Sequence, residues 1–355
     1  MARISVFCIL LSLLAGAVLL LVMGRNPLAA YGNFLQGSGL MIKAKYAGGQ
    51  GMVTDFLNLL DALTPMIFAS LAVAVAMKIG MFNIGVSGQM LTAAIFAHMV
   101  SARVEASAPL AKLLVILIGI LFGALVGALI GWLKYKFNIN EVVSSIMLNY
   151  IAMYLITFYI NTFYVNPVSR QSVPISAAAR LTLTSVPLGS WKVCIPLAFP
   201  LAILAAFLLR YLLDRTTAGY EIKAVGLSRG AARYAGVNIA RNLILTMTLS
   251  GALAGLAGVS WFCGHFDSIQ PGVVPNLGFD AIAVALLGNN NPIGCIFSSF
   301  LITVISQGSV YMSSQQGVES EIANLITAVI LIFAACSVFL RDYVNRLQRE
   351  MEDAS

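Results

Sequence analysis

Long apolar runs, separated by short polar or basic stretches, recur along the whole chain. Each run is close to the ~20 residues that a helix needs to cross a bilayer, and we predict a membrane helix for each. Their ranges are Ile4–Met23, Phe56–Met77, Phe82–Val100, Ala111–Leu133, Val142–Ile160, Val193–Leu213, Leu243–Phe262, Ile293–Met312 and Glu321–Leu340. The first run exceeds the roughly 7–15 apolar residues of a cleaved signal peptide, so we interpret it as a retained helix.

A tenth apolar piece, Gly278–Leu287, is too short to cross the bilayer at about 1.5 Å per residue. It ends in the sequence GNNNP, Gly288–Pro292, which breaks a helix. We predict a half-helix that is buried within the bundle, because irregular backbone at membrane depth must be satisfied by protein or by a water-filled cavity. The expected fold is therefore an all-α polytopic membrane protein with about ten transmembrane or re-entrant helices.

A second interrupted segment is expected at Phe82–Gly88. Phe82-Asn83 there and Phe279-Asp280 in the half-helix share a pattern of Phe followed by a polar residue. This pair suggests an internal repeat, an arrangement that transporters use around a substrate path.

Composition supports a single membrane domain over residues 1–355. Hydrophobic residues make up 59% and charged residues 10% of the chain, against roughly 25% charged in soluble domains, and the mean hydropathy is +0.90. The net charge of +7 comes from Lys and Arg between the apolar runs. That placement follows the positive-inside rule rather than a nucleic-acid-binding face, so no nucleic-acid partner is expected.

The basic residues also predict an orientation. They concentrate at residues 210–241 and in the C-terminal tail, so we expect both termini and the loop 214–241 on the cytoplasmic side. The Ser-, Thr- and Pro-rich loop 161–192 is then external.

Chemistry that would make the chain an enzyme is missing from the sequence. The five cysteines, Cys8, Cys194, Cys263, Cys295 and Cys336, form no metal-binding spacing. The His and acidic residues suggest no triad or carboxylate pair, and no GxxxxGK[ST] phosphate loop occurs. We expect no catalytic residues and no metal site.

Polar residues gather in one apolar setting, Lys78–Met90, which reads KIGMFNIGVSGQM. Asn83, Ser87 and Gln89 should face the bundle interior, because unpaired polar groups in hydrocarbon cost several kcal/mol. They either make interhelical hydrogen bonds or line a path.

This stretch resembles the signature of permease subunits of bacterial ABC importers of the branched-chain amino-acid, simple-sugar and nucleoside class. Gly219–Asn242 is similar to the cytoplasmic coupling loop of that class, and Gly278–Gly294 is similar to its broken late segment. Ile139–Ile151, INEVVSSIMLNYI, looks most like the nucleoside permeases.

The resemblance implies alternating access in the bacterial cytoplasmic membrane, among membrane lipid. It implies three protein partners: an ATP-binding motor subunit that holds ATP and Mg²⁺, a second permease, identical or related, and an extracytoplasmic substrate-binding protein. The chain itself should need no cofactor. Residues expected to line the substrate path are Phe82, Asn83, Gln89, Asn149 and Asp280.

Within the loop 214–241, Ser228 is a potential helix N-cap, and Gly236 would end the short helix. Small Ala231 and Ala232 would let this helix enter a groove of a partner. The resemblance carries the motor contacts to Gly226, Ala231, Ala232 and Gly236; without it, the loop could be only a positive-inside marker.

Alternatives remain open for the function. Asp280 is either the N-cap of the half-helix, a partner of a helix N-terminus or of a substrate hydroxyl, or an ion site in an ion-coupled secondary transporter. The scarcity of intramembrane charges speaks against the last. An ABC permease for a simple sugar is a further alternative, and a membrane scaffold would leave the polar cluster and the broken segment unexplained.

Overall fold

The computed structural model describes residues 14–18, 20–22, 24–43, 51–103, 107–188, 191–316, 325, 328, 329 and 332. Most of the predicted runs Ile4–Met23 and Glu321–Leu340 lie outside the described residues, as do both termini.

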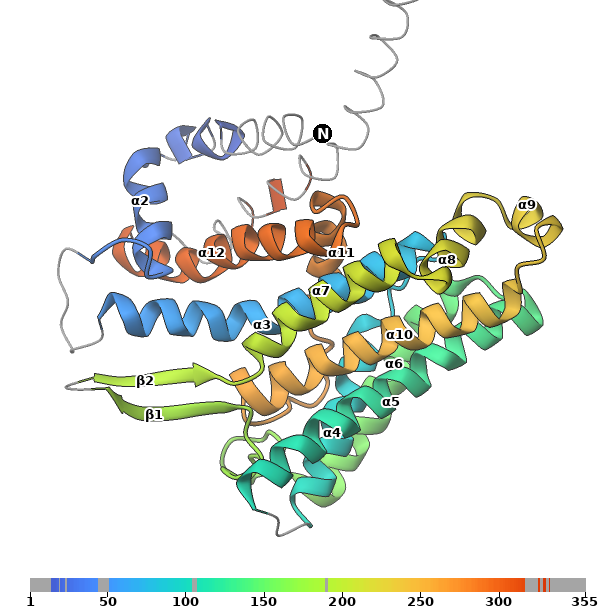
Figure 1. Cartoon of the computed structure of the whole chain (residues 1–355). Coiled ribbons are helices and arrows are strands. Elements are labelled where there is room, and N and C mark those ends of the chain that lie inside the picture. The colour runs from blue at the N-terminus through green and yellow to red at the C-terminus, as the bar shows by residue number, and fades with distance from the viewer. Residues whose placement is uncertain are drawn as a thin grey trace, which may run out of the picture.

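The described chain is a helical bundle with one small hairpin (Figure 1). Its elements are α2 (Pro27–Gly37), α3 (Met52–Lys78), α4 (Val86–Ser101), α5 (Ala108–Phe137), α6 (Glu141–Tyr159), the π-helix η1 (Ile160–Tyr164), β1 (Thr182–Leu188), β2 (Trp191–Pro196), α7 (Phe199–Arg215), α8 (Thr217–Leu227), α9 (Arg229–Tyr234), α10 (Ile239–Ser260), the π-helix η2 (Trp261–His265), α11 (Leu277–Leu287) and α12 (Pro292–Gln316).

Five helices of the described chain are long and apolar enough to cross a membrane. They are α3, α5, α6 with η1, α10 with η2, and α12, and a sixth span results if Leu14–Val22 and Pro27–Gly37, bent by 117°, count as one. The prediction of a polytopic helical membrane protein is confirmed. The count of ten and the repeat are not.

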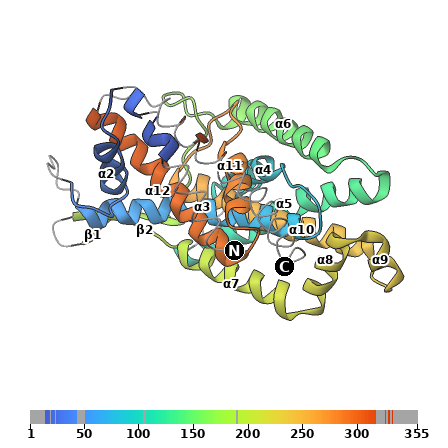
Figure 2. The same cartoon turned by 90° about the horizontal axis from the view of Figure 1, so that it is seen from above.

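Burial separates a central helix from peripheral ones. In the most apolar window of α3, 94% of the residues are buried, against 28% in α5. A helix that is apolar all round and buried belongs to the interior, whereas an exposed apolar helix faces lipid. Figure 2 shows α6 and α7 on opposite sides of the layer formed by α3 and α10.

Two apolar helices, α4 and α11, are shorter than the five long ones. The predicted half-helix is present as α11, and the turn after it places Asn289 and Asn290 at φ of 55° and 51°, a region that Asn tolerates well. Asn291 then caps α12, because its Oδ1 accepts from the Ile293 N–H at 3.0 Å. The interruption expected at Phe82–Gly88 is present, but it covers residues 79–85, where Gly80 has φ 73°. The run predicted to be helical from Phe82 therefore begins only at Val86.

Helices α5 and α10 approach each other closely at glycine residues. A Cβ on Gly123 would overlap the carbonyl oxygen of Gly251, and a Cβ on Gly255 would overlap that of Gly119. Small residues at four-residue spacing permit such backbone approach in a membrane. The glycines of Leu121–Gly131 on α5 and of Ser250–Gly258 on α10 therefore serve helix packing.

The expectation of an all-α fold is wrong in the loop 161–192 and just beyond it. β1 and β2 pair antiparallel, with Thr182 opposite Pro196 and Leu188 opposite Trp191. The predicted helix Val193–Leu213 therefore starts late, at Phe199, with a proline in its first turn. Pro196 cannot donate a backbone hydrogen bond and favours a strand end, while a proline in the first helical turn fixes the start of the helix.

The hairpin and the helices α8 and α9 lie at opposite ends of the bundle (Figure 1). We name these the hairpin end, which carries β1 and β2, and the loop end, which carries residues 214–241.

Candidate functional site

The α3–α4 break, residues 79–85, lies inside the bundle and is held by amide side chains. Asn83 is fully buried. Its Nδ2 donates to Ser250 Oγ at 2.7 Å and to Gln89 Oε1 at 3.1 Å, and its Oδ1 accepts from the Gly85 N–H at 2.9 Å. Ser250 in turn donates to the carbonyl oxygen of Ala72 at 2.6 Å. Asn83 therefore joins the break to α3, α4 and α10.

Asn149 of α6 supplies a cap for α4 from another helix. The Gly88 N–H, one of the first-turn donors that lack an intrahelical acceptor, donates to Asn149 Oδ1 at 2.9 Å. Asn149 Nδ2 donates to the carbonyl oxygen of Ile84 at 3.0 Å. One side chain thus satisfies backbone groups on both sides of the helix start, where the N-cap Gly85 has no side chain to do so.

Interhelical hydrogen bonding, one of the two interpretations of the polar stretch, is confirmed for Asn83. Asn149, which lies outside that stretch, also makes hydrogen bonds between helices. Gln89 is bonded to Asn83 within the same segment. Phe82 is half-buried beside them. Contact of these four residues with a substrate stays a prediction.

The starts of α4 and α11 touch. Ser87 Oγ donates to the carbonyl oxygen of Pro275 at 2.8 Å, and a Cβ on Gly278 would overlap Ser87 Oγ. The two short helices therefore present their N-termini side by side in the bundle.

Asp280 is half-buried in the first turn of α11. The N-cap interpretation of Asp280 is wrong, because the N-cap is Asn276. Among the described residues the Asp280 carboxylate has no hydrogen-bond or ion-pair partner, and its position suits the positive end of the helix dipole.

The two Phe-polar pairs that suggested a repeat occupy different structural positions. Asp280 is the fourth residue of α11, whereas Asn83 precedes α4.

The loop end carries the short helix that the sequence predicted. Ser228 caps α9, since its Oγ accepts from the Ala231 N–H at 3.3 Å. Gly236 has φ 81°, and the N–H groups of Gly236 and Val237 donate to the carbonyl oxygens of Arg233 and Ala232. This pair of bonds is a Schellman motif, which closes the helix.

The exposed surface of this loop differs from the one expected. Ala232 is 3% exposed and packs in the core, so only Ala231 of the two alanines is open to a partner. Leu227 and Tyr234 are 89% and 97% exposed. Sequence reasoning missed these two residues, although a large apolar side chain on either side of a short polar helix was a usable signal.

At Gly226, the backbone of α8 is in direct contact with the last residue of α3. A Cβ on Gly226 would overlap the carbonyl oxygen of Lys78, and a Cβ on Gly80 would lie 3.5 Å from the carbonyl oxygen of Gly226. Asn242 Nδ2 also donates to Glu221 Oε2 at 2.7 Å and ties α8 to α10. The loop end therefore contacts the α3–α4 break where the break begins.

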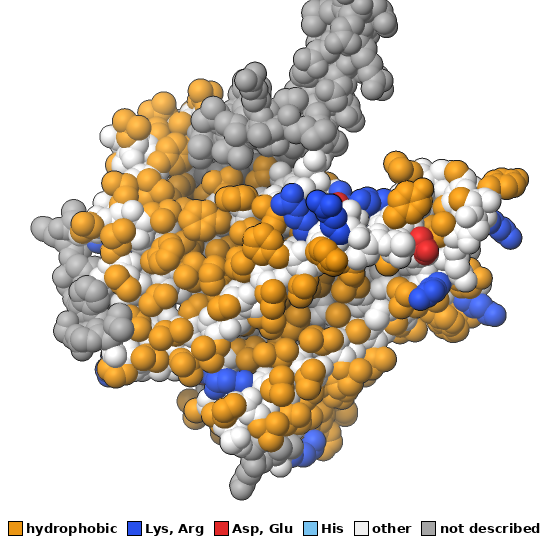
Figure 3. Space-filling model, viewed as in Figure 1, with side chains coloured by type: hydrophobic (Ala, Val, Ile, Leu, Met, Phe, Trp, Pro, Cys, Tyr) orange, Lys and Arg blue, Asp and Glu red, His pale blue; other side chains and the backbone are white. Residues whose placement is uncertain are grey.

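The surface has the character of a membrane protein. Hydrophobic side chains cover the middle of the face in Figure 3, and Lys and Arg gather toward α8 and α9. Among the described residues, no group of three His, Cys, Asp or Glu side chains could hold a metal ion.

A helical membrane bundle with buried, interrupted helices is the architecture of a transport protein. The chain belongs to the family described as branched-chain amino acid transport system / permease component, which matches residues 56–335. As a permease component, the chain is a transport protein of the ABC importer class and not an enzyme, as the sequence predicted.

Three relatives illustrate the similarity. The chain is 31% identical to the guanosine ABC transporter permease protein NupP of Bacillus subtilis, over 98% of this chain and 97% of that protein. It is 33% identical to the nucleoside ABC transporter permease protein NupB of Lactococcus lactis subsp. cremoris, over 94% and 90%. It is 28% identical to the glucose ABC transporter permease protein TsgB13 of Haloferax volcanii, over 95% and 88%.

Proposed function

We propose that the chain is the permease of a nucleoside importer and is driven by a separate ATP-binding motor. The observation that carries the substrate class is the similarity, over nearly the whole chain, to two proteins named for guanosine and nucleoside transport. The similarity to a glucose permease keeps a simple sugar as the second candidate.

The motor docks on the loop end in this proposal. Tyr234 and Leu227 are the apolar anchors of the docking surface, Ala231 lies between them, and Arg229 and Arg233 add charge around it. Exposed aromatic residues beside small ones suit a protein interface, in which a few large side chains carry most of the binding energy. ATP and Mg²⁺ are held by the motor, so the chain needs no cofactor of its own.

Movement at the docking surface reaches the helix break through Gly226. Because α8 meets the end of α3 without an intervening side chain, displacement of α8 is passed to Lys78 and Gly80. The break then shifts Asn83, and with it the N-terminus of α4 at Ser87. Ser87 is bonded to the α11 side of the bundle, so both short helices respond together in alternating access.

Docking of the motor on the loop end sets the orientation of the permease in the membrane and the sides on which its other partners bind. The loop end is cytoplasmic, both termini are cytoplasmic, and the hairpin end faces the extracytoplasmic substrate-binding protein. The permease sits in the bacterial cytoplasmic membrane, pairs with a second permease, identical or related, and is surrounded by lipid. About ten transmembrane or re-entrant helices are expected for the whole chain.

Substrate contact in this proposal falls at the meeting point of the two short helices. Phe82 and Asp280 are the path residues whose side chains are only half-buried, and they lie on the two interrupted segments. An ion-coupled transporter would instead use Asp280 as an ion site. Membership of an ABC permease family favours the ATP-driven mechanism.

Uptake in cells that lack the chain tests the substrate class. Cells deleted for the chain and complemented with it should regain uptake of labelled guanosine, and an excess of unlabelled adenosine or uridine should compete more strongly than glucose. Glucose as the better competitor would replace the nucleoside assignment by the sugar one. Uptake that follows an ion gradient and survives loss of every ATPase partner would replace the ATP-driven mechanism.

A further inference from the structure

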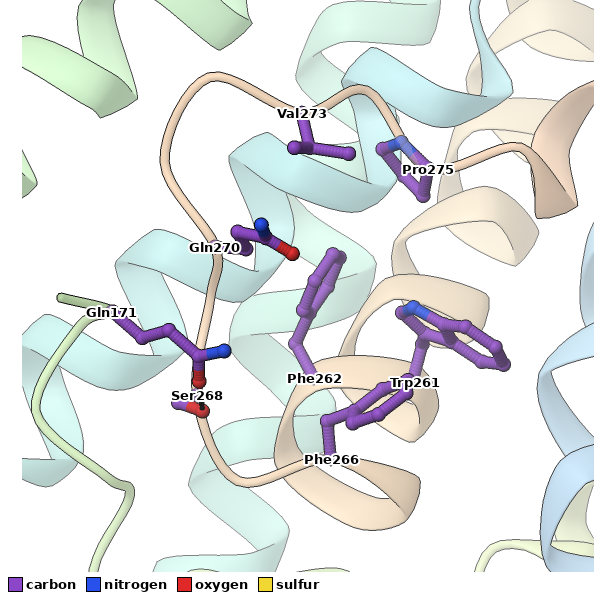
Figure 4. Close-up of a pocket in the computed structure, with 8 residues that line it drawn as sticks. All are labelled: Gln171, Trp261, Phe262, Phe266, Ser268, Gln270, Val273 and Pro275. Carbon is purple, nitrogen blue, oxygen red and sulfur yellow. Dashed lines mark hydrogen bonds between the residues drawn. The ribbon is translucent and has the colours of Figure 1, made fainter. Parts of the chain in front are cut away.

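A pocket of about 230 Å³ opens beside the last turn of α10, near the hairpin end (Figure 4). Its volume is several times the roughly 30 Å³ that one water occupies in the liquid, so it can take a planar ring system. Three of its walls are aromatic, formed by Trp261, Phe262 and Phe266, and Gln171 and Gln270 supply amide groups.

The π-helix η2 creates the aromatic wall. Residues five apart lie about 140° apart around an α-helix, so Trp261 and Phe266 would point in different directions if α10 simply continued. The Phe266 N–H instead donates to the carbonyl oxygen of Trp261 at 2.8 Å, and this i→i+5 turn brings the two rings to a centroid distance of 5.0 Å. Single π turns of this kind are frequent at functional sites.

Polar contacts behind the wall hold it in one orientation. His265 stacks on Trp261 at 5.2 Å and meets Phe266 edge-on at 4.8 Å. His265 Nδ1 lies 2.8 Å from Asp61 Oδ2 of α3, and Thr182 of β1 donates to Asp61 Oδ1 at 2.6 Å. Ring positions that are fixed before a ligand arrives reduce the entropy cost of binding.

The amide side chains sit on the opposite side of the opening. Ser268 donates to Gln171 Oε1 at 2.6 Å, which leaves the Gln171 amide N–H groups toward the pocket in Figure 4. Gln270 is exposed and is directed toward Phe262. Gln171 thus offers N–H donors and Gln270 offers both a donor and an acceptor, which are the groups that base edges match.

We propose that this pocket is a transit site for the nucleobase, where the ring stacks on Trp261 or Phe266 and the Gln171 and Gln270 amides meet its edge. The proposal deepens, and rests on, the proposed function of nucleoside import. Aromatic stacking suits a permease of this kind because every base has a π-face, so the contact is tolerant of base identity.

The pocket is connected to the helix break through its own loop. The segment 266–276 leaves the hairpin end and reaches Pro275, whose carbonyl oxygen accepts from Ser87 at the start of α4. His98 of α4 also lies 3.2 Å from the carbonyl oxygen of Phe262 through its Nε2. A shift of α4 during transport would therefore change the pocket and release a bound base.

Photolabelling of the assembled transporter tests the site directly. The complex in nanodiscs is irradiated with 8-azidoguanosine, and the labelled peptides are identified by mass spectrometry. Label should fall on the segment 261–275 and be displaced by guanosine and by free guanine, but not by ribose. Phe266→Leu should lower this labelling about tenfold, Phe266→Tyr should retain it, and Phe207→Leu on α7, also an exposed Phe, is the matched control.

Uptake assays separate failure of this site from failure of the function. Wild-type guanosine uptake together with label outside 261–275, or with unchanged labelling of Phe266→Leu, would overturn the pocket and leave nucleoside import standing. Displacement of the label by ribose would show a sugar contact and would also overturn it. Absence of guanosine uptake by the wild type would overturn the proposed function itself.

Discussion

The space that a Cβ on Gly226 would need is occupied by the carbonyl oxygen of Lys78. The last turn of α8 and the last residue of α3 therefore meet backbone to backbone, directly before the α3–α4 break. Because no flexible side chain lies between the two helices, a displacement of α8 moves the end of α3 by nearly the same amount. This contact is the physical link between the proposed docking surface and the interior of the bundle.

Gly226→Ala should lower substrate uptake several-fold. The added methyl must displace α8 from α3, and overpacking of this kind costs roughly 1–3 kcal/mol. Gly230→Ala, in the adjacent helix α9, is the matched control because its new Cβ would meet only Ser228 Oγ at 4.0 Å. Uptake assays at equal membrane expression compare the two; equal uptake would show that the α8–α3 contact does not transmit movement.

Tyr234→Ala should release the motor without unfolding the permease. Tyr234 is 97% exposed, so its loss should change stability by no more than about 0.5 kcal/mol, while loss of an aromatic anchor typically costs an interface about 2 kcal/mol or more. Tyr154→Ala on α6, 67% exposed, is the control. Affinity purification of the tagged chain measures how much ATPase subunit is retained, and full retention by Tyr234→Ala would place the docking surface elsewhere.

Ala232→Glu should behave differently from Ala231→Glu. Ala232 is 3% exposed, so a buried carboxylate there should destabilise the loop, whereas Ala231→Glu should leave folding intact and weaken motor binding. Thermal unfolding in mild detergent separates the two effects. Equal stability of both variants would contradict the burial of Ala232.

Asn149→Leu should destabilise the protein by about 1–3 kcal/mol for each buried group left unpaired. Both the Gly88 N–H and the Ile84 carbonyl oxygen lose their partner. Asn276→Ala, at an exposed position that makes no side-chain cap bond, is the control. A thermal unfolding temperature equal to that of the wild type would mean that α4 is not capped by α6.

Gly123→Ala should be destabilising, although a Gly-to-Ala change inside a helix normally gains roughly 0.5–1 kcal/mol. The sign reverses because the new Cβ meets the backbone of α10. Gly32→Ala on α2, where nothing lies within 4 Å, should be neutral or stabilising. Unfolding of both variants in detergent gives the comparison; a stabilised Gly123→Ala variant would refute the close α5–α10 packing.

Hydrophobic run length predicted the helices because a membrane segment is defined by one strong physical quantity. The long helices α3, α5, α6, α10 and α12 were predicted in this way. The half-helix α11 was predicted from its short apolar run and from the helix-breaking sequence GNNNP that follows it. The hairpin was missed because Val193–Pro196 is as apolar as the helix that follows it, and only Pro196 and Pro200 mark the change.

Side-chain roles were harder to predict than elements. The sequence predicted that Asn83, Ser87 and Gln89 face the interior, but polarity alone does not distinguish a hydrogen bond between helices from the lining of a path. The contact of His265 with Asp61 joins positions 204 apart in the chain, and no local pattern signals it. The burial of Ala232 and exposure of Tyr234 likewise depend on how α9 is seated, which only the folded chain decides.

ATP-driven uptake by the purified complex tests the central claim most directly. The tagged chain is purified with its partners, reconstituted into proteoliposomes without an ion gradient, and supplied with the substrate-binding protein, labelled guanosine and ATP. The account predicts guanosine accumulation that needs ATP and the motor and falls in Tyr234→Ala. A chain that purifies alone and drives guanosine uptake by an ion gradient, without ATP, would contradict it.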